Sequence, residues 1–201
     1  MARGETTSLE GGAASPLARQ LELDDGDLDQ LGDLFEEAAA AYGTDGRVVF
    51  AALKKGAPFG KALGISAKAV EFLYFRARKW FQAGRPGEAE TIFRALCILD
   101  PDRADFWAGL GVCLRMREAW NEALAAFSKA AEKRPDWAVP HFHRLEIFVR
   151  RGAWGEAASE MAAFEARKGA GLLPQFVVEA AKYKKVIEKH HLKEPRNGRR
   201  P

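Results

Sequence analysis

The sequence predicts an all-α protein, built as a row of helical hairpins with further helices before and after them. Three observations lead to this class. Alanine, leucine and phenylalanine are common, whereas valine and isoleucine, which favour strands, are sparse. Small and aromatic residues recur at a fixed spacing of 34 through the middle of the chain. Apolar residues on both sides of that region recur at helical spacing.

Charge is distributed unevenly along the 201 residues, although the net charge is only +3. Residues 1–45 hold eleven acidic residues and two arginines, whereas residues 182–201 hold eight basic residues and two acidic ones. A basic tail can bind nucleic acid, but this one has no interleaved aromatic residue beyond Tyr183. We therefore interpret the tail as a frayed terminus and expect no nucleic-acid partner.

The sequence also lacks the features of a membrane or secreted protein. No apolar run approaches the ~20 residues that a membrane-spanning helix needs, so we expect no direct membrane insertion. The first residues contain no apolar segment typical of a secretory signal. The only cysteines, Cys97 and Cys113, lie inside apolar helical patterns. This usage favours a reducing compartment such as the cytoplasm.

Motifs for chemistry are missing. No glycine-rich phosphate-binding loop is present, and no paired-cysteine motif. His141 and His143 are two residues apart, so on a helix they point in different directions. We therefore predict no catalytic residue, no metal and no cofactor, and a protein that is not an enzyme.

The region before the repeats divides into two parts. Residues 1–27 are rich in glycine, alanine, serine and acids, and we predict a disordered acidic extension. Residues 28–66 show helical periodicity, broken at Gly43 and again at Gly56. An apolar stripe on its first helix predicts a weak homodimer contact through Leu31, Phe35 and Tyr42.

The repeat itself is defined by matching residues 34 positions apart. Prolines, aromatic residues and small residues recur at fixed offsets: Pro101 and Pro135, Phe93 and Phe127, Ala77 and Gly111, and Ala89, Ala123 and Ala157. This period and these residue types are the tetratricopeptide pattern. Within residues 67–171 we predict three repeats, at 70–103, 104–137 and 138–171. Small residues on the paired helices are expected to face each other, Gly111 against Ala123, so that the backbones approach closely.

The third repeat departs from this pattern, and a further helix follows it. Leu145 stands where the first two repeats have a small residue, and Met161 stands where they have an aromatic residue. Residues 172–192 carry an apolar stripe that includes Phe176, and we predict a helix that caps the last repeat. Residues 193–201 are predicted to form a disordered basic tail.

The first helix of each repeat is expected to line the concave face of such an array. Positions 2, 5, 9 and 12 of each repeat are expected to point inward. The candidates for a peptide-binding groove among them are Tyr74, Arg78, Phe81, Ala108, Val112, Arg115, Phe142 and Glu146. Glu71, Asp105, Val139 and Val149 complete the set. Aromatic and charged residues together favour a groove for an extended peptide, with the aromatic side chains exposed while the groove is empty.

Several stretches are more specific than a generic repeat. They read LKKGAPFGKALGIS, EFLYFRARKWFQAGRPGEAETIFRALCILDP and FWAGLGVC, and weaker matches follow at Phe142, His143 and Glu146. In this order they resemble the tetratricopeptide chaperones of type III secretion translocators, the SycD/LcrH class. The resemblance covers about residues 47–165.

This resemblance implies a virulence-associated cytoplasmic chaperone with a self-associating N-terminal region. Its concave groove would hold a short extended segment of a hydrophobic secreted translocator, and so keep that protein soluble and competent for export. The groove residues that it implies are Tyr74, Phe81, Ala108, Val112 and Phe142. Arg78 stands where the family often has an aromatic side chain.

Two other functions remain open from the sequence alone. A generic tetratricopeptide scaffold could join two folded proteins, and gene neighbours that encode secretion components would argue against it. A nucleic-acid-binding protein could use the basic tail, and salt-dependent binding of random oligonucleotides would favour it.

Overall fold

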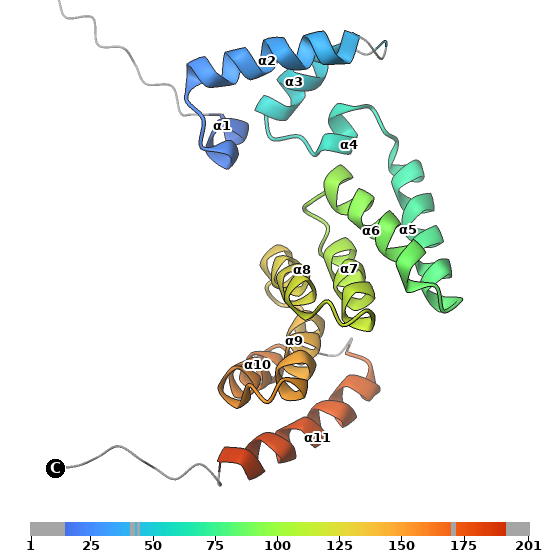
Figure 1. Cartoon of the computed structure of the whole chain (residues 1–201), viewed down its shortest axis with the longest axis vertical. Helices are drawn as coiled ribbons and strands as arrows, with labels where there is room; N and C mark the ends of the chain where they lie inside the picture. Colours follow the sequence, from blue (N-terminus) through green and yellow to red (C-terminus); the bar gives the residue numbers. More distant parts are fainter. Residues whose placement is uncertain (1–14, 41–42, 44, 170–171, 192–201) are drawn as a thin grey trace, which may run out of the picture. The chain divides into compact units, whose positions relative to one another are not determined.

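The computed structural model describes residues 15–40, 43, 45–169 and 172–191. These residues form eleven helices and no strand, which confirms the all-α class (Figure 1). The chain divides after Ser66 into two compact units, and each is described by itself. Within the described residues, no helix combines the length and apolar character that crossing a membrane requires.

The first unit contains four helices. They are α1 (Pro16–Leu21), α2 (Asp25–Ala40), α3 (Gly46–Lys54) and α4 (Phe59–Ala62). The prediction of disorder up to residue 27 is therefore wrong for residues 15–27, and residues 1–14 lie outside the described part. Helix α1 forms because the Ser15 hydroxyl accepts a hydrogen bond from the Ala18 amide and proline occupies the first turn.

Helices α2 and α3 cross closely at Gly46. A Cβ at this position would lie 2.6 Å from the Cα of Glu36, so only glycine permits the approach. Phe35 packs against Phe50, with ring centroids 6.0 Å apart, and Leu31 joins the same cluster. Two of the three residues expected at a dimer interface thus contribute to the core of their own unit. Tyr42 lies outside the described residues.

The second unit contains the helical hairpins. Its helices are α5 (Ala67–Gln82), α6 (Pro86–Leu99), α7 (Ala104–Met116), α8 (Trp120–Lys133), α9 (Ala138–Arg150), α10 (Trp154–Ala166) and α11 (Pro174–His191). Each of the three expected repeats holds one antiparallel pair. The turn inside each pair has a residue with positive φ at the same place: Gly84, Glu118 and Gly152. The 34-residue period therefore also describes backbone conformation.

The contact of Gly111 differs from the expected one. A Cβ on this residue would lie 2.7 Å from the ring of Phe127, so the aromatic residue of α8, rather than Ala123, occupies the space nearest to it. The small position and the aromatic position of the pattern are thus complementary: the ring fills the room that the missing side chain leaves.

The third hairpin shares its core with α11. Leu145, Met161 and Phe164 are buried, and Ala180 and Ile187 of α11 belong to the same cluster. Helix α11 lies beside α9 and α10 (Figure 1). A large residue fits at position 145 because α11 supplies a further apolar surface.

Candidate functional site

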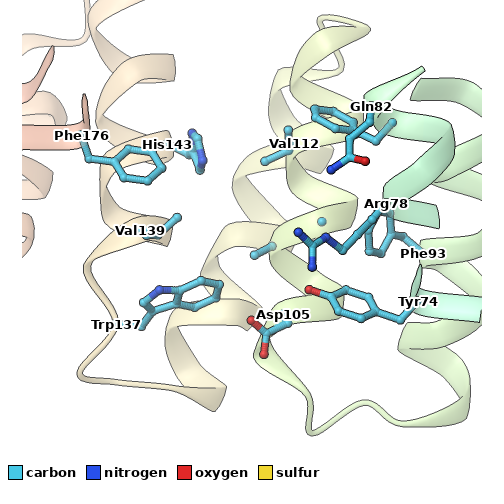
Figure 2. A pocket seen from close by; sticks show the side chains of 13 residues that line it. Tyr74, Arg78, Gln82, Phe93, Asp105, Val112, Trp137, Val139, His143 and Phe176 are labelled. Carbon is cyan, nitrogen blue, oxygen red and sulfur yellow. The ribbon is translucent and has the colours of Figure 1, made fainter. Parts of the chain in front are cut away.

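A cavity of about 520 Å³ lies on the first helices of the hairpins. Its lining comes from α5, α7 and α9, with Phe93 of α6, Trp137 and Phe176 of α11 completing it. In Figure 2, Tyr74, Arg78 and Gln82 lie on one side of this space, and Trp137, Val139, His143 and Phe176 lie on the other. We call it the first cavity.

Aromatic side chains fix the α5 wall of the first cavity. The ring of Tyr74 lies 6.1 Å from that of Phe93 and 5.3 Å from that of Phe106, between centroids. Gly109 permits this arrangement, since a Cβ there would overlap the Phe93 ring. Burial raises the pKa of Tyr74, so its hydroxyl stays neutral near pH 7. This wall offers an apolar surface with a neutral hydroxyl that can form hydrogen bonds.

Two charged residues also line the first cavity. Asp105 pairs with Arg134 at 2.5 Å. No ion pair of Arg78 is observed among the described residues. The first cavity is therefore apolar on most of its surface and carries one cation without an anionic partner in the described chain.

A second cavity, of about 400 Å³, lies between α7, α9 and α11. His143 and Phe176 line it as well as the first, so they form the wall between the two. Most of its other lining residues are polar or charged: Arg115, Glu146, Arg150, Gln175, Glu179 and Tyr183, with Phe142.

An ion-pair cluster occupies the second cavity. Glu146 is 7% exposed and lies 2.6 Å from Arg115 and 3.4 Å from Arg150. Burial disfavours its charged form, but His143 and Arg115 outweigh this effect and hold its pKa below the usual value. The carboxylate is thus ionised near pH 7, and its charge is already compensated.

His143 is the least expected residue of the site. It stacks on Phe127, with centroids 4.9 Å apart, and meets Phe176 edge to face. Burial lowers its pKa, so the imidazole is neutral near pH 7. From the sequence, His143 was weighed as a metal ligand and noted as a weak match to the chaperone family, but it was not expected to line the groove. In the described residues, no group of three potential ligands lies close enough to hold a metal.

The eight candidate groove residues all line one of the two cavities. Five line the first (Tyr74, Arg78, Phe81, Ala108 and Val112) and three line the second (Arg115, Phe142 and Glu146). Phe142, however, is only 5% exposed and packs against Phe164 and Phe176. The expectation of an exposed aromatic side chain at this position is wrong, because the capping helix covers it.

Sequence reasoning missed six lining residues of the first cavity. They are Gln82, Phe93, Gly109, Trp137, His143 and Phe176. Trp137 immediately precedes α9, and Phe176 belongs to α11, so neither lies on the helical positions used for the prediction. The apolar stripe of residues 172–192 did contain Phe176, but as part of a cap.

Comparison with known proteins places this geometry in a family. A tetratricopeptide-repeat model matches residues 76–137. Low calcium response locus protein H of Yersinia pseudotuberculosis is 31% identical over 147 residues, which cover 68% of this chain and 85% of that protein. The chaperone protein SicA of Salmonella dublin is 30% identical over 83 residues, which cover 41% of this chain and 50% of that protein.

Solved structures show the same fold. The chain is similar to a type III secretion complex from Aeromonas hydrophila (26% identity, TM-score 0.63, 72% of this chain and 97% of that one). It is also similar to the Yersinia enterocolitica chaperone SycD in complex with a peptide of the translocator YopD (27% identity, TM-score 0.58, 65% of this chain and 98% of that one). A third similar structure is that of PcrH in complex with the chaperone-binding region of PopD (28% identity, TM-score 0.57, 65% of this chain and 97% of that one). The chain therefore belongs to the tetratricopeptide-repeat chaperones of type III secretion that include low calcium response locus protein H.

Proposed function

We propose that the chain is a bacterial cytoplasmic chaperone that holds an extended segment of a hydrophobic type III secretion translocator in the two cavities. By holding this segment it keeps the translocator soluble and competent for export. The observation that carries this proposal is the apolar first cavity, built from three successive hairpins. The relatives support it, because structures of SycD and PcrH contain segments of the translocators YopD, PopD and PopB.

The binding free energy of one segment is the difference between what burial of its apolar side chains contributes and what ordering of its backbone costs. A buried apolar side chain contributes about 1.5–3 kcal/mol. Ordering a flexible segment costs about 2–5 kcal/mol. One short segment therefore binds weakly, and firm holding needs several contacts along the groove. Weak individual contacts suit a cargo that has to be released for export.

We propose that the chain acts by binding and not by catalysis. Its two thiols are buried, and burial raises the pKa of both Cys97 and Cys113 to about 12. Neither forms a thiolate readily near pH 7, so neither is suited to be a nucleophile. Both remain free thiols in the structure, which fits a reducing compartment.

Co-expression with candidate translocators, followed by co-purification, tests the proposed function. Val112→Arg should abolish co-purification, because it places a cation in the apolar part of the first cavity. Ile98→Arg is the matched control, since Ile98 is 63% exposed and lines neither cavity. Equal retention of cargo by both variants, with unchanged circular dichroism, would contradict the proposal.

We further propose that residues 28–56 carry a weak homodimer contact. Leu34 is 63% exposed and Val48 is 64% exposed on this unit, so apolar surface remains available after Leu31 and Phe35 are packed inside. Sedimentation of the chain with Leu34→Glu should show a lower concentration-dependent mass than the parent chain. An unchanged mass would place the contact elsewhere. A solved structure of SycD describes an alternative dimer, so self-association has a precedent in a relative.

A further inference from the structure

Arg78 is the feature of the first cavity that an apolar cargo segment alone does not explain. It extends from α5 into the space that Trp137 and Val139 face from the opposite side (Figure 2). Its guanidinium lies 5.9 Å from the centroid of the Tyr74 ring. Across the described part of the chain, no carboxylate lies within ion-pair distance of it.

Two acidic residues in this part of the groove already have partners. Asp105, which lines the same cavity, pairs with Arg134 at 2.5 Å. Glu71, one turn before Tyr74 and two turns before Arg78 on α5, pairs with Arg103. The charge of Arg78 is therefore uncompensated within this end of the groove.

An occupant of the first cavity changes the environment of this charge. A bound segment displaces water from the apolar walls, and a charge that loses water without gaining a partner costs free energy. A carboxylate beside the guanidinium removes that cost and forms a charge-assisted, bidentate hydrogen bond. Partial exclusion of water also strengthens the attraction between the two charges.

The second cavity does not offer the same site. Its two arginines, Arg115 and Arg150, both lie beside Glu146, at 2.6 and 3.4 Å. A carboxylate entering there would compete with a buried anion that is already in place. Of these two cavities, only the first therefore has an arginine without a carboxylate partner among the described residues.

We propose that Arg78 determines specificity, by pairing with an aspartate or glutamate that lies next to the apolar anchor of the bound segment. This inference rests on the proposed function and adds the chemistry of the cargo to it. The natural segment should combine one or more apolar anchors with an acidic side chain at a fixed distance from them.

Selection from a random ten-residue peptide library displayed on phage tests this, with the full chain immobilised. The parent chain should enrich peptides that carry an acidic residue at a fixed offset from an apolar one. Arg78→Gln should lose that preference, and Arg78→Glu should enrich lysine or arginine at the same offset. Lys79→Gln is the matched control, because Lys79 is the next residue on α5 and lines neither cavity.

Fluorescence anisotropy with one selected peptide gives the magnitude. Replacing its acidic residue by glutamine should weaken binding to the parent chain about tenfold at low salt, and much less to Arg78→Gln. A uniform loss for acidic and neutral peptides in Arg78→Gln would overturn the inference, because Arg78 would then contact only the peptide backbone.

Two further outcomes separate this inference from the proposed function. Enriched peptides that bind the parent chain, fail to bind Val112→Arg and show no acidic preference would overturn the role of Arg78 and leave the groove function intact. If no enriched peptide depends on Val112, the proposed function fails, and the inference fails with it.

Discussion

The two cavities of the groove differ in what their first helices supply. The first cavity takes apolar side chains from α5 and α7, and its one charge without an intramolecular partner in the described chain is Arg78. The second cavity holds an ion-pair cluster around Glu146 and is bordered by the core of the third hairpin. The first cavity thus offers a ligand an apolar surface with one unpaired cation, whereas in the second cavity the Glu146 carboxylate already pairs with two arginines. An acidic side chain of a ligand therefore meets less competition in the first cavity.

The second cavity differs from the first because the capping helix α11 packs against α9. Phe176 of α11 packs against Phe142 and His143 at centroid distances of 4.8 and 5.8 Å. These contacts convert the groove face of α9 into a packed interface. Helix α11 reaches the first cavity only through Phe176, so the surfaces of α5 and α7 that line this cavity remain accessible.

Truncation of Phe142 should give the largest effect and distinguishes the two cavities most directly. Phe142→Ala removes a buried ring from the shared core of α9, α10 and α11, and we expect a loss of about 3–5 kcal/mol in unfolding free energy. Chemical denaturation followed by circular dichroism measures it. A loss below about 1 kcal/mol would mean that α11 does not pack on this ring in solution.

Truncation in the first cavity should instead affect binding. Tyr74 and Phe81 are both only partly buried, so the double change to alanine should leave the helical content nearly unchanged. It should weaken cargo binding at least tenfold, because two apolar contacts are lost. Co-purification and circular dichroism on the same sample test both parts. Unfolding of the double variant would show that these residues are core, and unimpaired binding would place the cargo elsewhere.

Acidification should destabilise the chain through His143, which forms part of the wall between the two cavities. Burial lowers the pKa of His143, so the unfolded chain binds a proton more readily than the folded one. Stability from the neutral imidazole is complete above the unfolded pKa of about 6.5 and falls as the pH drops below it, by up to about 1.4 kcal/mol per pH unit.

Denaturation curves at pH 7, 6 and 5 check this expectation. His143→Phe should flatten the loss of stability between pH 6.5 and 5, since it removes the group that titrates. His190→Gln serves as the control, because His190 stacks on Trp154 outside both cavities. Identical pH dependence in the parent chain and His143→Phe would assign the acid sensitivity to another group.

Periodicity predicted more of the first cavity than of the second. Tyr74, Phe81, Ala108 and Val112 lie at repeat positions whose direction follows from helix geometry, and all four line the first cavity. The same rule selected Phe142, but it could not show that a later helix covers this residue. His143 was missed because it does not occupy one of the repeat positions expected to point inward. It packs against Phe127 of the neighbouring hairpin and Phe176 of α11.

The sequence by itself determined the helical class, the 34-residue hairpin and the capping helix, because each depends on local periodicity and on residues that recur at fixed spacing. It also supplied the motifs that resemble the chaperone family. Tertiary structure alone decided which groove residues are exposed, which charges are paired and that α1 is ordered. Exposure and charge pairing depend on contacts between helices distant in sequence, and no periodic pattern within one helix encodes them.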